Sequence, residues 1–266
     1  MQSDSIVLLT LTDLALAYIL VLLTLALARY QKLGREGEML WASIRMVVQL
    51  LAIGYLLDRV FAVNHPLAVL AILLVMGLFA LQVIGSRVQE KMPGFYRIMG
   101  VSLMIGCGLV AFFFCSLIVG YEPWYSPRYL IPLAGMIFGN SINGATLAAE
   151  RLGSEIRSQR DAIETALSLG ASPRQAIQWP LRNAFRAALI PATNSMAAMG
   201  IVALPGMMTG QILSGTAPII AVRYQIAIMC AITGCVALTS LLILLQGYRT
   251  YFSQSQGLVL PAKKSS

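Results

Sequence analysis

The stretch "LAVLAILLVMGLFALQVIGS", residues 67–86, has no charged side chain in 20 consecutive residues. A helix of about 20 mainly apolar residues is long enough to cross the hydrocarbon core of a bilayer. Working outward from it, six other stretches have similar length and composition. The sequence therefore predicts an all-α, polytopic membrane protein with about seven transmembrane helices, at residues 6–28, 39–61, 67–86, 98–120, 129–149, 187–213 and 223–247.

The composition agrees with a membrane protein, because 58% of the 266 residues are hydrophobic and only 11% are charged. Soluble domains have about 25% charged residues. Little chain remains outside the seven stretches, and the longest polar interval is residues 150–186. We expect one transmembrane domain, residues 1–266, with a coupling region at about 150–186 and no separate soluble domain.

The basic residues alternate from one inter-helix segment to the next. Fifteen of them fall on one side of the predicted membrane and three on the other, with Arg45 inside a predicted helix. By the positive-inside rule the rich side is cytoplasmic, so we expect the N-terminus outside and the C-terminus in the cytoplasm. This distribution assigns the formal charge of +8 to the membrane surface and its lipids, not to nucleic acid.

The first apolar stretch is not predicted to be a signal peptide. No basic residue precedes it, Asp4 and Asp13 precede or interrupt it, and it is longer than the usual apolar region of 7–15 residues.

The residue types that enzymes and metal sites need are nearly absent. His65 is the only histidine, the four cysteines lie in predicted spans without CxxC spacing, and no Gly-Lys pair occurs for a GxxxxGK[ST] loop. Only Asp13 lies well within an apolar stretch, and no two carboxylates share a helix face in the membrane. We expect no catalytic site and no cofactor on this chain, so any ATP must be bound by a partner.

The polar interval has the pattern of two short helices joined by a tight turn. Ser158 and Asp161 resemble a capping box, Gly170 suits the position after a helix end, and Ser172-Pro173 suits the start of the next helix. Such a bent pair could transmit force to a partner. An amphipathic surface helix lying on lipid head groups explains the spacing about equally well.

Within this interval, Glu164-Thr165-Ala166 followed by Gly170 resembles the E-A-A-x-x-x-G start of the coupling loop by which ABC-transporter permeases contact their ATPases. The match is partial, because Thr165 replaces an alanine and the later proline is displaced to Pro180. The resemblance implies that these residues and the turn that follows contact the ATPase. They are Glu164, Ala166, Leu167, Leu169, Gly170, Ala171, Ser172 and Pro173.

Four motifs extend the resemblance over nearly the whole chain. They are "IPLAGMIFGN" (131–140), "LSLGASPRQA" (167–176), "RAALIP" (186–191) and "LPGMMTGQI" (204–212). Together they are similar to the FetB family of permeases, which includes iron exporters and aluminium-tolerance permeases. This implies a permease homodimer in a bacterial inner membrane with two copies of a separate ATPase, which holds ATP and Mg, and export of iron or a related metal.

The spans at 129–149 and 187–213 carry small and polar residues that the other spans mostly lack. Buried amides in a bilayer must face protein or water, so they are candidates for a substrate pathway. Close helix packing explains the glycines, apolar filling explains the methionines, and snorkelling explains Arg45. The pathway candidates, with no metal ligand set assigned, are Arg45, Gln49, Met136, Asn140, Asn143, Asn194, Met207 and Met208, with Ser195 beside them.

Pro205-Gly206 would break or kink the predicted span at 187–213 and free backbone carbonyls at membrane depth. Two other function classes fit the same residues: a membrane scaffold that binds a cytosolic ATPase without transport, and a channel that needs no ATP. Neither the substrate nor the direction of transport follows from the sequence.

Overall fold

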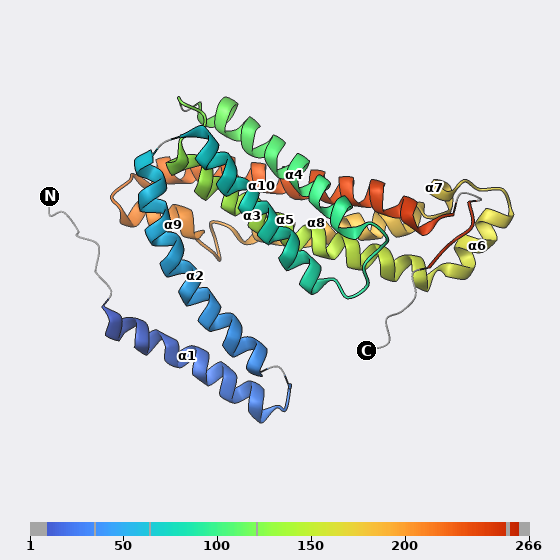
Figure 1. Cartoon of the computed structure of the whole chain (residues 1–266), viewed down its shortest axis with the longest axis horizontal. Helices are drawn as coiled ribbons and strands as arrows, with labels where there is room; N and C mark the ends of the chain where they lie inside the picture. The colour runs from blue at the N-terminus through green and yellow to red at the C-terminus, as the bar shows by residue number, and fades with distance from the viewer. Residues whose placement is uncertain (1–9, 35, 64, 121, 254–255, 261–266) are drawn as a thin grey trace. The chain divides into compact units, whose positions relative to one another are not determined.

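The computed structural model describes residues 10–34, 36–63, 65–120, 122–253 and 256–260. These residues form helices and connecting turns, with only two isolated β-bridges (Figure 1). The predicted all-α class is confirmed. In chain order the helices are α1 (Leu11–Tyr30), α2 (Glu36–Val63), α3 (Pro66–Arg87), α4 (Phe95–Phe113), the π-helical η1 (Phe114–Val119), α5 (Pro127–Ser158), α6 (Arg160–Ser168), α7 (Pro173–Ala176), α8 (Gln178–Ala198), α9 (Gly206–Leu213), α10 (Pro218–Gly247) and the 3-10 helix η2 (Tyr248–Tyr251).

Within the described residues, six helices are long and apolar enough to cross a membrane: α1, α2, α3, α4 with η1, α5, and α10 with η2. By length and composition the described residues thus contain six candidate spans where the sequence predicted seven, and the difference lies in the stretch 187–213. That stretch is not one helix but the end of α8, a non-helical segment and α9. α8 fails the apolar criterion because its helix includes Arg182, Asn183 and Arg186.

The break between α8 and α9 was expected at Pro205-Gly206 and begins earlier. α8 ends at Ala198, and Gly200 takes a left-handed conformation with φ +84°. The backbone then folds on itself, as Gly200 N–H donates to Ala203 C=O at 2.9 Å and Ala203 N–H donates to Ala198 C=O at 3.1 Å. The predicted interruption is confirmed, but it occupies the whole segment from Met199 to Pro205.

The chain divides into two compact units, which we describe separately. Unit 1 contains α1 and α2, joined side by side by a hydrogen bond of 2.7 Å between the Tyr18 and Ser43 hydroxyls. Asp13 belongs to a capping box at the start of α1, where its carboxylate accepts from the Thr10 backbone N–H at 2.8 Å. Asp13 is thus explained by helix capping, since acceptors are favoured at a helix N-terminus.

Unit 2 contains α3 to α10, except Leu213 at the end of α9, and carries nearly all of the buried core. α3, α4, α8 and α10 all pack on α5. α8 runs the length of this bundle: Asn183 near its start contacts Glu155 of α5, and Met199 after its end accepts from Gln225 of α10 at 3.7 Å. Figure 1 shows the loop after α3, the α6–α7 segment and the end of α10 at the same end of unit 2.

Two glycines allow the helices of unit 2 to approach closely. A Cβ on Gly106 of α4 would lie 2.3 Å from the Thr239 Oγ1 of α10. A Cβ on Gly144 of α5 would lie 2.6 Å from Val236 Cγ1 and 3.5 Å from the Ala188 carbonyl oxygen. The core therefore depends on glycines that a GxxxG pattern does not single out.

The four cysteines are free. Cys107, Cys115 and Cys235 are buried and Cys230 is exposed. The Cys235 thiol lies 3.2 Å from the Ser141 hydroxyl and 3.5 Å from Cys107 Sγ, so these residues fill the space between α4, α5 and α10.

Candidate functional site

The predicted glycine turn is present between α6 and α7, at one end of unit 2. Gly170 has φ +88°, and its N–H donates to Leu167 C=O at 3.0 Å, while Ala171 N–H donates to Ala166 C=O at 3.0 Å. This is the Schellman arrangement, which satisfies the last carbonyls of a helix. Because no heavy atom lies within 4 Å of the position of a Cβ, the need for glycine here is conformational and not steric.

The next helix starts where the sequence predicts. Ser172 and Gln175 form a reciprocal capping box: Ser172 N–H donates to Gln175 Oε1 at 2.9 Å, and Gln175 N–H donates to Ser172 Oγ at 3.4 Å. Pro173 occupies the first helical position. The predicted cap at Ser158 is wrong, because α5 continues to that residue and α6 has no side-chain cap. We call residues 159–177 the elbow.

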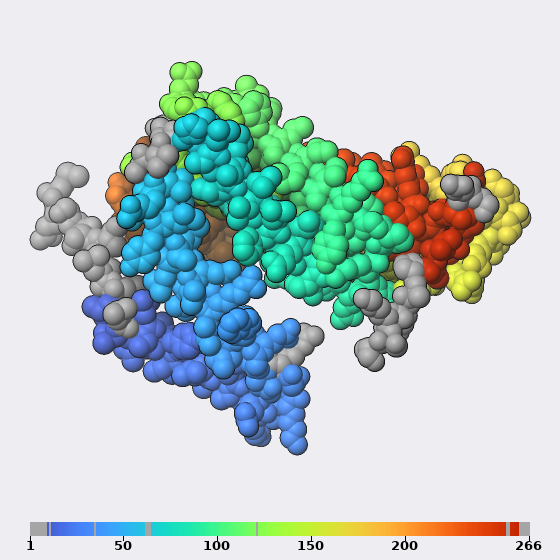
Figure 2. Space-filling model, in the orientation of Figure 1, coloured from blue at the N-terminus to red at the C-terminus, as the bar shows by residue number. Residues whose placement is uncertain are grey.

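The elbow presents apolar side chains to its surroundings. Leu169, at the turn, is 84% exposed, and Trp179, in the first turn of α8, is 62% exposed. Figure 2 shows the elbow (yellow) at the end of unit 2, beside the end of α10. Glu164 is ion-paired with Arg160 at 2.8 Å, and this hydrogen bond raises the pKa of the Arg160 guanidinium. The arrangement offers a partner a rigid turn with an apolar tip.

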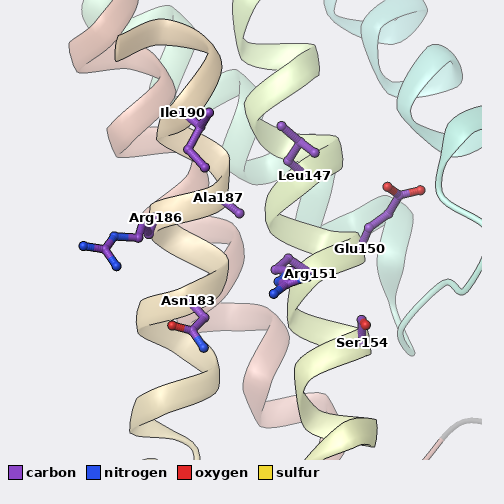
Figure 3. Close-up of a pocket in the computed structure, with 8 residues that line it drawn as sticks. All are labelled: Leu147, Glu150, Arg151, Ser154, Asn183, Arg186, Ala187 and Ile190. Carbon is purple, nitrogen blue, oxygen red and sulfur yellow. The ribbon is translucent and has the colours of Figure 1, made fainter. Parts of the chain in front are cut away.

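A groove of about 590 Å³ lies between α5 and α8, next to the elbow. Figure 3 shows the two helices side by side, with Arg151 and Asn183 lying toward the space between them and Leu147 and Ile190 farther along. Arg186 points away from α5. The groove thus has a charged end near the elbow and an apolar end toward the middle of the bundle.

Glu155 fixes α5 to α8 and to the elbow. Glu155 is only 7% exposed. Its carboxylate accepts hydrogen bonds from Arg151 at 2.8 Å, Gln159 at 2.7 Å and Asn183 at 3.2 Å. A buried charge is stable only when it is paired and hydrogen-bonded. Glu155 therefore links the last part of α5 to α8 and to the first residue of the elbow.

A second ion pair, between Arg157 and Glu90, fastens α5 to the loop after α3. The sequence analysis did not identify it. Nor did it identify the Glu155 cluster, although the spacing of Arg151, Glu155 and Gln159 by four residues is a usable signal for a shared helix face. Asn183 is 28 residues from Glu155, and no local pattern links the two.

The pathway candidates of unit 2 lie on three different helices. Asn140 Nδ2 donates to the Met136 carbonyl at 2.8 Å on α5, and Asn143 Oδ1 accepts from Arg87 of α3 at 3.0 Å. Asn194 is exposed on α8. The other candidates lie elsewhere: Met207 and Met208, partly buried, on α9, and Arg45 and Gln49, both exposed, on α2 of unit 1.

Gly139, Asn140 and Asn143 are exposed on one side of α5, which we call the α5 polar face. A Cβ on Gly139 would meet no heavy atom within 4 Å, and the same holds for Gly206 and Gly210. The close-packing interpretation of these GxxxG glycines is therefore not supported within a single chain. Among the described residues, no three His, Cys, Asp or Glu side chains come together as a metal site.

Replacing Glu155 with leucine is expected to destabilise unit 2 by about 2 kcal/mol, because Asn183 and Gln159 lose a buried acceptor. Thermal unfolding of the purified protein measures this change. Glu164→Leu is the matched control, since the Arg160–Glu164 pair has the same spacing and the same 2.8 Å distance but is exposed; it should leave the midpoint unchanged. Equal shifts in both variants would show that Glu155 is not a structural link.

A family model described as "Uncharacterised protein family (UPF0014)" matches residues 11–252. A UPF0014 membrane protein of Synechocystis sp. is 41% identical over 236 residues, covering 89% of this chain and 91% of its own length. No solved structure matches.

Two further relatives have more specific names. The "Probable iron export permease protein FetB" of Escherichia coli is 31% identical over 252 residues, covering 95% of this chain and 96% of that protein. The "Protein ALUMINUM SENSITIVE 3" of Arabidopsis thaliana is 34% identical over 227 residues, covering 85% of this chain and 82% of that protein. The resemblance to the FetB family is thereby confirmed.

Proposed function

The chain belongs to the UPF0014 family of membrane proteins, and from that premise we propose that it is the permease subunit of an ABC transporter that exports iron or a related metal. ATP, with Mg, is bound and hydrolysed by a separate ATPase subunit. Two copies of this chain form the membrane part, in the inner membrane of a bacterium. The observation that carries the proposal is the elbow, whose structure fits a contact with a moving partner.

The elbow supports coupling for two reasons. Its turn is held by backbone hydrogen bonds on both sides of Gly170, so it can be displaced without losing its shape. Glu155 then joins the elbow to α5 and α8 through Gln159 and Asn183. Closure of an ATPase against Leu169 would move both helices together and shift the bundle between inward-open and outward-open states.

The α5 polar face supports a homodimer with an internal pathway. Asn140 and Asn143 are exposed on a helix long and apolar enough to span the membrane, where contact with lipid is unfavourable. A second copy of the chain, with a water-filled space between the two, would cover them. Amides and thioethers hold a metal weakly, which suits transport.

The two alternative functions, a scaffold and a channel, predict different experimental results. A scaffold binds the ATPase but moves no solute, and a channel moves a solute without the ATPase. The chain carrying an affinity tag should therefore copurify from its own cells with an ATPase that contains a GxxxxGK[ST] loop. Recovery of the intact permease without any such ATPase would contradict the proposal and favour a channel.

The orientation proposed from the basic residues places the N-terminus outside and the C-terminus in the cytoplasm. Both termini lie outside the described residues. The orientation requires α8 to pass through the membrane although it is too polar to count as a spanning helix by composition. Packing against α5 and α10 can shield such a helix from lipid.

Single cysteines at Ser168 and Val202, in a variant without the native cysteines, test this passage because they precede and follow α8. Ser168→Cys should react with an impermeant thiol reagent only from the cytoplasmic side, and Val202→Cys only from the outside. Reaction of both positions from the same side would show that α8 does not cross.

A further inference from the structure

Three arginines on α7 and α8 have no acidic partner among the described residues. Arg174, Arg182 and Arg186 are exposed and form no ion pair there. The other arginines of the same interval, Arg151, Arg157 and Arg160, each have a glutamate. Unpaired and paired arginines therefore occur together at one end of unit 2, and only the unpaired ones lie along α7 and α8.

Two of these unpaired arginines, Arg174 and Arg182, border a groove of about 430 Å³ between α7, α8 and α10. Its polar lining also includes Gln178. Its apolar lining includes Leu181, Phe185, Leu241 and Leu245. Arg182 and Phe185 also border a second cavity of about 560 Å³, which continues along α8 to Leu189 and Thr193.

We propose that this groove binds one anionic phospholipid of the cytoplasmic leaflet. Arg174 and Arg182 hold the headgroup phosphate, because a guanidinium donates two parallel hydrogen bonds to phosphate oxygens. The acyl chains lie along Phe185, Leu241 and Leu245. Basic grooves between helices at the cytoplasmic side of a membrane are a recognised site for anionic lipid headgroups.

The combination of charge and apolar surface favours a lipid over a free phosphate. A free phosphate would satisfy the arginines but leave Phe185 and Leu241 uncovered. The groove also begins at α7, in the elbow, so a bound lipid would tie the start of α8 to the membrane surface. This inference requires that unit 2 lies in a membrane with the elbow at its cytoplasmic side, as proposed above, and it stands whether or not the chain exports a metal or binds an ATPase.

The test uses the purified full chain in a neutral detergent. Phosphatidylglycerol is titrated against the thermal midpoint, beside phosphatidylcholine with the same acyl chains and soluble glycerol phosphate. A ligand that binds the native state raises the midpoint according to its concentration and affinity. We expect phosphatidylglycerol alone to raise it strongly, with an affinity about tenfold or more lower in the double variant Arg174→Gln/Arg182→Gln.

Arg97→Gln is the matched control, because Arg97 is exposed near the start of α4 and does not border the groove. It removes the same kind of charge and should bind phosphatidylglycerol as the wild type does. An equal effect of phosphatidylcholine or of glycerol phosphate would overturn the proposal, as would equal affinities in the double variant and Arg97→Gln.

Native mass spectrometry of the wild-type protein gives a second readout that needs no variant. After purification from mixed vesicles of phosphatidylglycerol and phosphatidylcholine, one phosphatidylglycerol per chain should be retained. Retention of no lipid, or of both lipids in the ratio of the vesicles, would contradict the site.

Discussion

Replacing Gly144 with valine is expected to destabilise the bundle of unit 2 by about 3 kcal/mol. The new Cβ would lie 2.6 Å from Val236 Cγ1, 3.3 Å from Ser240 Oγ and 3.5 Å from the Ala188 carbonyl oxygen. α8 and α10 would both have to move away from α5. The midpoint of thermal unfolding of the purified protein measures the loss, together with the yield of folded protein from the membrane.

Gly139→Val is the matched control, since it lies on the same helix and adds the same side chain. Nothing lies within 4 Å of its Cβ position, so its midpoint should stay close to that of the wild type. The two variants share the cost of placing a β-branched residue in a helix. Similar midpoints for both variants would mean that α5, α8 and α10 do not pack as described.

Replacing Gly170 with valine is expected to reduce ATPase activity stimulated by the permease about tenfold. Valine at a positive φ costs about 1–2 kcal/mol, which is enough to open the turn between α6 and α7. Leu169 would then lose its fixed position at the tip of the elbow. ATP hydrolysis by the partner ATPase, measured with and without the permease in vesicles, gives the stimulation.

Gly170→Asn is the control, because asparagine tolerates the left-handed conformation that Gly170 adopts at φ +88°. It should keep most of the stimulation, and both variants should reach the membrane in normal amounts. Glu164→Lys, which reverses a charge on the elbow, should also weaken coupling. Full stimulation in Gly170→Val and Glu164→Lys would remove the elbow from the ATPase contact.

Sequence reasoning predicted the parts of the fold that depend on local patterns. The apolar stretch at 67–86 became α3, which begins at Pro66, and Gly170, Ser172 and Pro173 occupy the turn and cap positions expected of them. The capping of α3 by His65, whose Nδ1 accepts from Leu67 N–H at 3.3 Å, gives the only histidine a structural role.

The parts that were missed depend on contacts between distant residues. The sequence analysis predicted one helix over 187–213 because the residues before Ala198 and after Gly206 are both largely apolar. Hydropathy does not reveal the backbone turn at Gly200 that separates α8 from α9. The role of Glu155 was missed because its burial comes from the packing of α8 on α5. The hydrogen bond between Arg87 and Asn143 was missed because the two residues are 56 positions apart in the sequence. Hydropathy and capping rules do not contain that information.

The most direct test of metal export is uptake into inside-out vesicles that contain the permease and its ATPase. We predict ATP-dependent accumulation of iron(II), or of manganese or zinc as the related metal, with Asn140→Leu reducing uptake if the α5 polar face lines the pathway. Accumulation of none of these metals, or accumulation that does not depend on ATP, would contradict the proposed export function.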